Sequence, residues 1–92
     1  MKKITWGEKV DMILIYPHVT IRQIEALFGI GQPSAMELRD KALKLAEKEG
    51  RWTVSKKAPT DLVIKAAGLD YDYFRNMAMK ESVARSGKNQ RN

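Results

Sequence analysis

A mainly α-helical fold is what the sequence predicts, and three observations point to it. Apolar residues recur three and four positions apart in several successive segments, which is the spacing of one face of a helix. Two of these segments follow a threonine that has Glu or Gln three residues later, a pattern that satisfies free N–H groups at a helix start. Glycine stands directly after the apolar stripe at points where a helix can end. We therefore expect at least four helices and little strand.

The first predicted helix begins near Trp6 and ends at Tyr16-Pro17. Thr5 and Glu8 form the capping box at its start. Its apolar residues recur at positions i, i+4, i+7 and i+8, and we expect this stripe to pack across the next two helices, as the first helix of a trihelical unit does. The stripe consists of Trp6, Val10, Ile13 and Leu14.

Two further helices, joined by a tight glycine turn, are predicted between Thr20 and Gly50. Thr20 and Gln23 form a capping box, and Gly29 can adopt the positive φ that stops the first of these helices. The second opens with residues 32–34, where the missing N–H of the proline does no harm. The apolar stripes are Ile24, Leu27 and Phe28 on the first helix and Ala35, Leu38, Ala42, Leu45 and Ala46 on the second.

This pair of helices predicts a helix-turn-helix, in which the second helix can lie in the major groove of DNA. The first buried position of the second helix is the small residue Ala35, which fits that motif. A plain helical hairpin in a small bundle accounts for the spacing equally well. Composition must decide between the two interpretations.

The segment 51–59 differs from the helices before it. Its β-forming residues are Trp52, Thr53 and Val54. Lys56 and Lys57 belong to the polar tip that follows, so the segment predicts a short hairpin or wing. The two lysines are placed to touch a DNA phosphate, and a solvated turn is the alternative.

Two shorter helices and a basic tail complete the prediction. Thr60 can cap a helix that closes at Gly68, and Asp70 or Asp72 can begin a last helix that runs to about Ala84. Residues 85–92 are polar and basic, and we expect them to be disordered. The chain is thus predicted to be a single helical domain over residues 1–84 followed by a tail.

Length and composition exclude several classes of function. A chain of 92 residues forms one domain with a small core, and no paired carboxylates, activated nucleophile or phosphate-binding glycine loop is evident, so we do not expect an enzyme. With no cysteine and His18 as the only histidine, neither a metal site nor a cofactor is expected. The longest apolar run, from Met12 to Tyr16, is too short to cross a membrane. We expect a cytoplasmic protein.

The net charge of +6 favours a polyanionic partner, and it is concentrated in the second half of the chain. Residues 1–50 hold eight basic and seven acidic side chains, whereas residues 51–92 hold nine and four. The outward face predicted for the helix after the glycine turn is mixed: it carries Met36, Glu37, Asp40, Lys44 and Glu47. Affinity for DNA must therefore depend on a set of cations made up of Arg39, Lys41, Lys44, Lys56, Lys57 and the tail.

The run GIGQPSAMELRDKA resembles the turn and second helix of small phage and mobile-element helix-turn-helix proteins of the excisionase-like and prophage-regulator group. The stretch from Thr20 to about Asp70 also resembles short proteins encoded beside integrases in conjugative elements of Gram-positive bacteria. These resemblances imply DNA binding by Gln32, Ser34 and the exposed side of the helix that follows, with the basic loop on the DNA backbone.

Two functions follow as hypotheses. The first is a sequence-specific DNA-binding protein of a phage or integrative element, acting as an excisionase (a recombination directionality factor) or a small repressor in a bacterial host, with an integrase as a possible further partner. A domain of this size covers little DNA, so we expect a dimer or cooperative binding through Tyr71, Phe74 and Met77. The second is a phage-encoded module that binds a host protein, which the mixed charge of the outward face favours.

Overall fold

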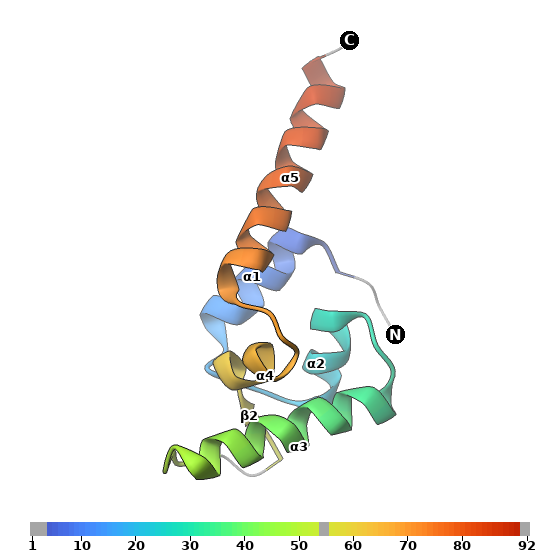
Figure 1. Cartoon of the computed structure of the whole chain (residues 1–92). Helices are drawn as coiled ribbons and strands as arrows, with labels where there is room; N and C mark the ends of the chain where they lie inside the picture. Colours follow the sequence, from blue (N-terminus) through green and yellow to red (C-terminus); the bar gives the residue numbers. More distant parts are fainter. Residues whose placement is uncertain (1–3, 54–55, 91–92) are drawn as a thin grey trace.

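The computed structural model describes residues 4–53 and 56–90, and these form five helices and two very short strands (Figure 1). The prediction of a mainly α-helical chain with little strand is confirmed. In chain order the elements are α1 (Trp6–Ile15), β1 (His18–Val19), α2 (Ile21–Phe28), α3 (Gln32–Lys48), β2 (Ala58–Pro59), α4 (Thr60–Ala66) and α5 (Tyr71–Gln90).

Local capping fixes the starts of three helices. Both predicted capping boxes are present: the Thr5 hydroxyl accepts the Glu8 N–H at 3.1 Å, and the Thr20 N–H donates to the Gln23 side chain at 2.9 Å. At α5, the Tyr73 N–H donates to the Asp70 carboxylate at 2.8 Å, so Asp70 is the residue that begins this helix. Each of these side chains accepts a hydrogen bond from a backbone N–H that has no partner within the helix.

The core lies where α3 meets α2, α4 and the two strands. The α3 side of it is made of three alanines with no exposed surface, and small side chains of this kind let neighbouring elements approach the helix closely. Leu38 and Leu45, which were also predicted to be buried, are half-buried at the edges of the α3 contact. The buried residues of the cluster are Val19, Ile24, Leu27, Ala35, Ala42, Ala46, Ala58, Leu62 and Val63.

Helix α1 packs along α5, which corrects the prediction that it crosses the next two helices (Figure 1). Met12 and Ile13 of α1 also pack against the core cluster, and together these contacts cover only part of the helix. At about 100° per residue, Leu14 lies about 80° from Trp6 around the helix, outside that part. Leu14 is accordingly 67% exposed, and its predicted place in the core is wrong.

Aromatic rings join α1, α2 and α5. The ring of Phe74 lies 5.9 Å from Trp6, 5.8 Å from Phe28 and 5.7 Å from Tyr73, measured between centroids. Phe74 is only 1% exposed. It therefore anchors α5 to the rest of the fold, and it is not available on the surface for the association that was predicted through Tyr71, Phe74 and Met77; Tyr71 and Met77 are themselves half-buried.

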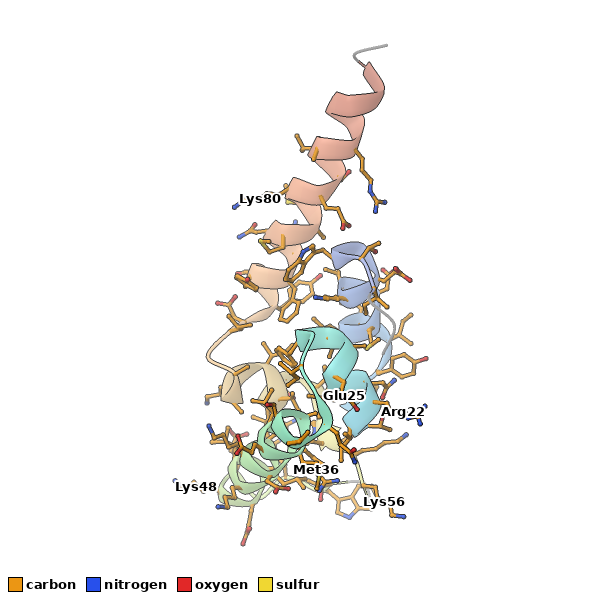
Figure 2. The ribbon with its side chains drawn as sticks, turned by 90° about the vertical axis from the view of Figure 1, so that its right-hand side faces the viewer. Arg22, Glu25, Met36, Lys48, Lys56 and Lys80 are labelled. Atoms are coloured by element: carbon orange, nitrogen blue, oxygen red, sulfur yellow. The ribbon has the colours of Figure 1, made fainter. Side chains whose placement is uncertain are left out.

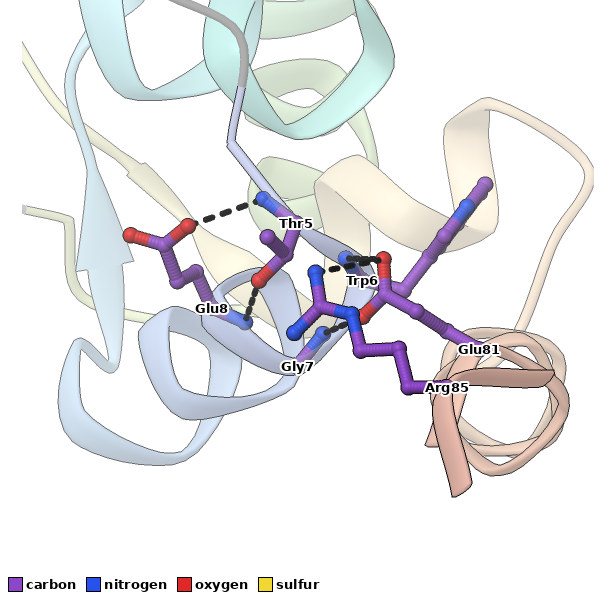
Figure 3. A network of polar contacts seen from close by, with 6 residues as sticks. All are labelled: Thr5, Trp6, Gly7, Glu8, Glu81 and Arg85. Atoms are coloured by element: carbon purple, nitrogen blue, oxygen red, sulfur yellow. Dashed lines mark hydrogen bonds and ion pairs between the residues drawn. The ribbon is translucent and has the colours of Figure 1, made fainter. Parts of the chain in front are cut away.

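A carboxylate from α5 closes the N-terminus of α1 (Figure 3). Glu81 accepts the N–H groups of Trp6 and Gly7, each at 3.3 Å, and the Arg85 guanidinium lies 4.0 Å from the same carboxylate. The free N–H groups at the start of a helix carry partial positive charge, which a carboxylate satisfies well. The contact joins residues 75 positions apart in the sequence.

The prediction of a hairpin within residues 51–59 is wrong. Residues 51–53 are not in a strand, Val54 and Ser55 lie outside the described residues, and the strand β2 pairs instead with β1, antiparallel, with Val19 opposite Ala58. Thr60 strengthens this junction, because its N–H donates to the Pro17 carbonyl at 2.9 Å and its hydroxyl donates to the Tyr16 carbonyl. The prediction that the Thr60 side chain caps α4 is therefore wrong.

Helix α5 runs to Gln90, beyond the end expected near Ala84. The segment predicted as a disordered tail is thus helical over residues 85–90, and residues 91 and 92 lie outside the described part of the chain. The second half of α5 projects away from the other helices (Figure 1). Across the residues that the structure describes, no helix combines the length and the hydrophobicity that crossing a bilayer requires.

Candidate nucleic-acid interface

A three-residue turn, Gly29–Gly31, sets the direction of α3. Gly29 ends α2 in the left-handed conformation, with φ of 63°, and its N–H donates to the Glu25 carbonyl at 2.8 Å. Gly31 precedes α3 in extended backbone, and proline occupies the first turn of the helix. The predicted turn is confirmed in this local geometry, and it leads into a helix that lies across one end of the molecule (Figure 1).

Helix α3 has one buried side and one open side. The face opposite its buried alanines carries the residues that were predicted to point outward, and each of them is exposed: Met36, Glu37, Asp40, Lys44 and Glu47. Gln32 and Ser34, at the start of the helix, are exposed as well, as is Lys41. Most of the predicted site residues are therefore brought together on one accessible helix face.

Arg39 differs from the other predicted site residues. Its side chain is only 22% exposed, and its terminal nitrogen Nη2 lies 3.5 Å from the Asp40 carboxylate. Among the described residues, its buried Nε has no hydrogen-bond partner. A cation in this position is partly withdrawn from the surface, because the Arg39 side chain lies beside the buried face of α3.

Lys56 and Lys57 are exposed where the loop after α3 returns to β2. Lys56 adopts a φ of 62°, a left-handed conformation that is unfavourable for a side chain other than glycine. The two ends of the loop are fixed in different ways. Pairing of β2 with β1 holds the end that carries the lysines, and Arg51 holds the beginning.

Arg51 is occupied by an ion pair with α4. Its guanidinium donates to both carboxylate oxygens of Asp61, at 2.8 and 3.1 Å, and lies 3.7 Å from Glu49. The hydrogen bonds from Arg51 hold the pKa of the Asp61 carboxyl below its ordinary value of 3.8, against the smaller opposite effect of partial burial. Trp52, the next residue, is 88% exposed.

Sequence reasoning missed two cations on this end of the molecule, Arg22 and Lys48. Both are exposed. Figure 2 shows Arg22 and Lys56 on one side of the molecule and Lys48 on the other, with Met36 between them. Lys48 follows Lys44 by one helical turn, so its periodicity could have identified it. Arg22 comes near the loop only through the pairing of β1 with β2, for which the sequence has no local signal.

The chain has no recognisable relatives in three comparisons. No protein-family model, no curated protein and no solved structure matches it. Function must therefore be inferred from the side chains themselves.

This end of the molecule presents polar, aromatic and cationic side chains to solvent. Within the described ranges, His, Asp and Glu side chains form no group of three that could hold a metal ion. The exposed groups here are the polar side chains of α3, the Trp52 indole and several cations. A shallow apolar groove beside the helix, between α3 and α4, is lined in part by Ser34 and Lys41.

Proposed function

We propose that this protein binds double-stranded DNA as a helix-turn-helix module, with α2 as its first helix and α3 in the major groove. One observation carries the proposal: α3 buries three alanines against the rest of the fold, with partly buried leucines beside them, while residues 32–34 and the face opposite the alanines are exposed at one end of the molecule. A recognition helix needs this access, because the major groove admits an α-helix and its N-terminal residues contact the base edges.

The side chains of α3 divide into two groups by their chemistry. Gln32 can contact adenine with two hydrogen bonds, Ser34 can bond to several bases, and Met36 offers an apolar contact to a thymine methyl group. Glu37 and Asp40 can accept from the amino group of cytosine. The lysines that contact the DNA backbone in this proposal are Lys41, Lys44, Lys56 and Lys57.

The biological role that we propose is excision or repression in a phage or integrative element within a bacterial cytoplasm. The resemblance of residues 29–42 to excisionase-like and prophage-regulator proteins supports it. Such a small domain covers a short site, so binding to neighbouring sites together, or together with an integrase, would supply the missing specificity. Because Phe74 is buried, any association through α5 has to use its exposed side, where Met79 and Val83 are 57% and 70% exposed.

The proposal is tested by selecting duplexes from a randomised pool with the purified protein and measuring their affinity by fluorescence anisotropy. We expect a sequence preference and a dissociation constant of about 10 nM or better for the selected site. Gln32→Ala should reduce discrimination by about 1 to 3 kcal/mol at one base pair, with the salt dependence unchanged. Ser82→Ala, at an exposed site on α5, is the control. Finding no duplex bound more tightly than about 10 μM at low salt would refute the proposal.

A protein-binding role is the second candidate, and the exposed Trp52 favours it. An indole that is 88% exposed resembles the anchor of a protein interface, where tryptophan is enriched. The exposed acids of α3 could bind a partner as well. Neutralising the acids separates the two functions. Glu37→Gln with Asp40→Asn should raise non-specific DNA affinity, because phosphate repulsion is removed, whereas a partner that recognises these acids should bind less tightly.

A further inference from the structure

We propose that the surface around α3 carries two separate basic rows, one for each strand of B-form DNA. The helix row consists of Lys41, Lys44 and Lys48 on α3, and the loop row consists of Arg22 on α2 with Lys56 and Lys57 in the loop before β2. This inference rests on the proposed function and extends it, because it names the form of nucleic acid that fits and adds two contact residues, Arg22 and Lys48.

The helix row is set by helical periodicity. Its lysines stand at positions i, i+3 and i+7, which share one side of a helix, and all three are exposed. The ion pairs formed among the described residues involve Arg39, Arg51 and Arg85, so these lysines keep their charge for another partner. At 1.5 Å per residue the row is about 10 Å long, enough for two or three phosphates along one strand.

The loop row is set by tertiary structure. Pairing of Val19 with Ala58 brings the start of α2 next to the end of the loop, and Figure 2 shows Arg22 and Lys56 on the same side of the molecule. The left-handed backbone of Lys56 is held between this pairing and the Arg51–Asp61 ion pair at the other end of the loop. Residues that keep an unfavourable φ in a constrained loop are often positioned for a contact.

Acidic side chains lie between the two rows. At about 100° per residue, Met36, Asp40 and Glu47 fall within about 40° of one another around α3, on the flank that faces the loop row. Lys48 lies on the other side of Met36 in Figure 2. With the cations at the two edges, Asp40 and Glu47 face the base edges of the groove, where cytosine can donate to them. Glu37 is the exception, because it falls about 20 to 40° from the lysines of the helix row. The arrangement explains how a mixed face can approach DNA.

Cations on both sides of one exposed helix fit one form of nucleic acid. The major groove of B-form DNA is about 12 Å wide and is bordered by a phosphate backbone on each side, so a helix within it has one strand on each flank. The major groove of an A-form RNA duplex is too narrow and deep for side chains to read. A single strand has only one backbone. We therefore expect tight binding to B-form DNA and much weaker binding to an RNA duplex or a single strand of the same sequence.

Three double variants, each with two charges fewer, test the rows. Lys44→Ala with Lys48→Ala removes part of the helix row, and Arg22→Ala with Lys56→Ala removes part of the loop row. Arg75→Ala with Lys80→Ala, at two exposed sites on α5, is the matched control. Lys80 lies far from α3 in Figure 2. Affinity for the selected duplex is measured against salt concentration. Each row variant should flatten the slope of log K against log salt by about 1.8, and the control should leave it unchanged.

Neutral methylphosphonate linkages in one strand at a time then assign each row to a strand. On a duplex in which the strand contacted by one row is neutral, the variant of that row should bind as tightly as the unaltered protein. On a duplex in which the other strand is neutral, the same variant should bind less tightly than the unaltered protein. Three results would each overturn the inference while leaving DNA binding intact. They are row variants that behave like the control, two rows that respond to the same neutral strand, and equal affinity for an RNA duplex. Failure of the unaltered protein to bind any duplex would instead refute the proposed function.

Discussion

Replacing Phe74 by alanine should remove a large part of the stability of this domain. Phe74 is 1% exposed and its ring contacts those of Trp6, Phe28 and Tyr73, which belong to α1, α2 and α5. Truncating a buried phenylalanine to alanine costs about 3 to 5 kcal/mol. A domain of 92 residues has a total free energy of unfolding of about 5 to 14 kcal/mol. The variant should therefore lose between about a fifth and all of this free energy.

Urea denaturation followed by circular dichroism measures this loss. The midpoint should fall with an unchanged slope, and the melting temperature should fall by at least about 12 °C. Phe74→Leu keeps most of the volume but loses the ring contacts, so its cost should be smaller than that of Phe74→Ala. Val83→Ala on the same helix, at a site 70% exposed, should change stability by less than about 0.5 kcal/mol. A loss below about 1 kcal/mol for Phe74→Ala would show that α5 does not pack on α1 and α2 through this ring.

Two further predictions concern the turn and the loop. Gly29→Ala should cost about 1 to 2 kcal/mol in thermal denaturation, because Gly29 has a φ of 63° and open space around it, so the strain comes from the backbone alone. Gly31→Ser, at a φ of −81°, is the control and should keep stability or raise it by a few tenths of a kcal/mol; equal effects at both sites would contradict the left-handed turn. The lowered pKa of Asp61 means that its ion pair stabilises the fold fully above pH of about 4 and is lost as the pH falls through the folded-state value. Asp61→Asn should therefore make stability less dependent on pH below about 4, and a pH dependence identical to that of the unaltered protein would refute this role.

The features that could be predicted are those encoded within about four residues. The Thr5 and Thr20 capping boxes and the helix end at Gly29 all follow from neighbours along the chain, and the structure has each of them. The alanine face of α3 follows from periodicity in the same way. These local signals also placed the exposed residues of α3 correctly, from Gln32 to Glu47.

The features that were missed depend on which surfaces meet. An apolar stripe on α1 shows that one side is buried but does not name the partner, so its packing on α5 could not be foreseen. Thr60 is a favourable cap by residue type, yet its hydroxyl satisfies the Tyr16 carbonyl because β2 pairs with β1. The same pairing brings Arg22 beside the loop lysines. An isolated arginine on a helix has no pattern that would have identified it.

The contact between Glu81 and the start of α1 has a consequence for how the chain folds during synthesis. It closes a loop that spans 75 residues, so α1 leaves the ribosome long before its partner exists. At about 5 to 20 residues per second, the delay is about 4 to 15 s. Throughout that time Trp6 lacks the rings of Tyr73 and Phe74 that pack against it, whereas α2, α3 and α4 are close in sequence and can assemble as they emerge. The last helix to be made is thus the one that completes the first.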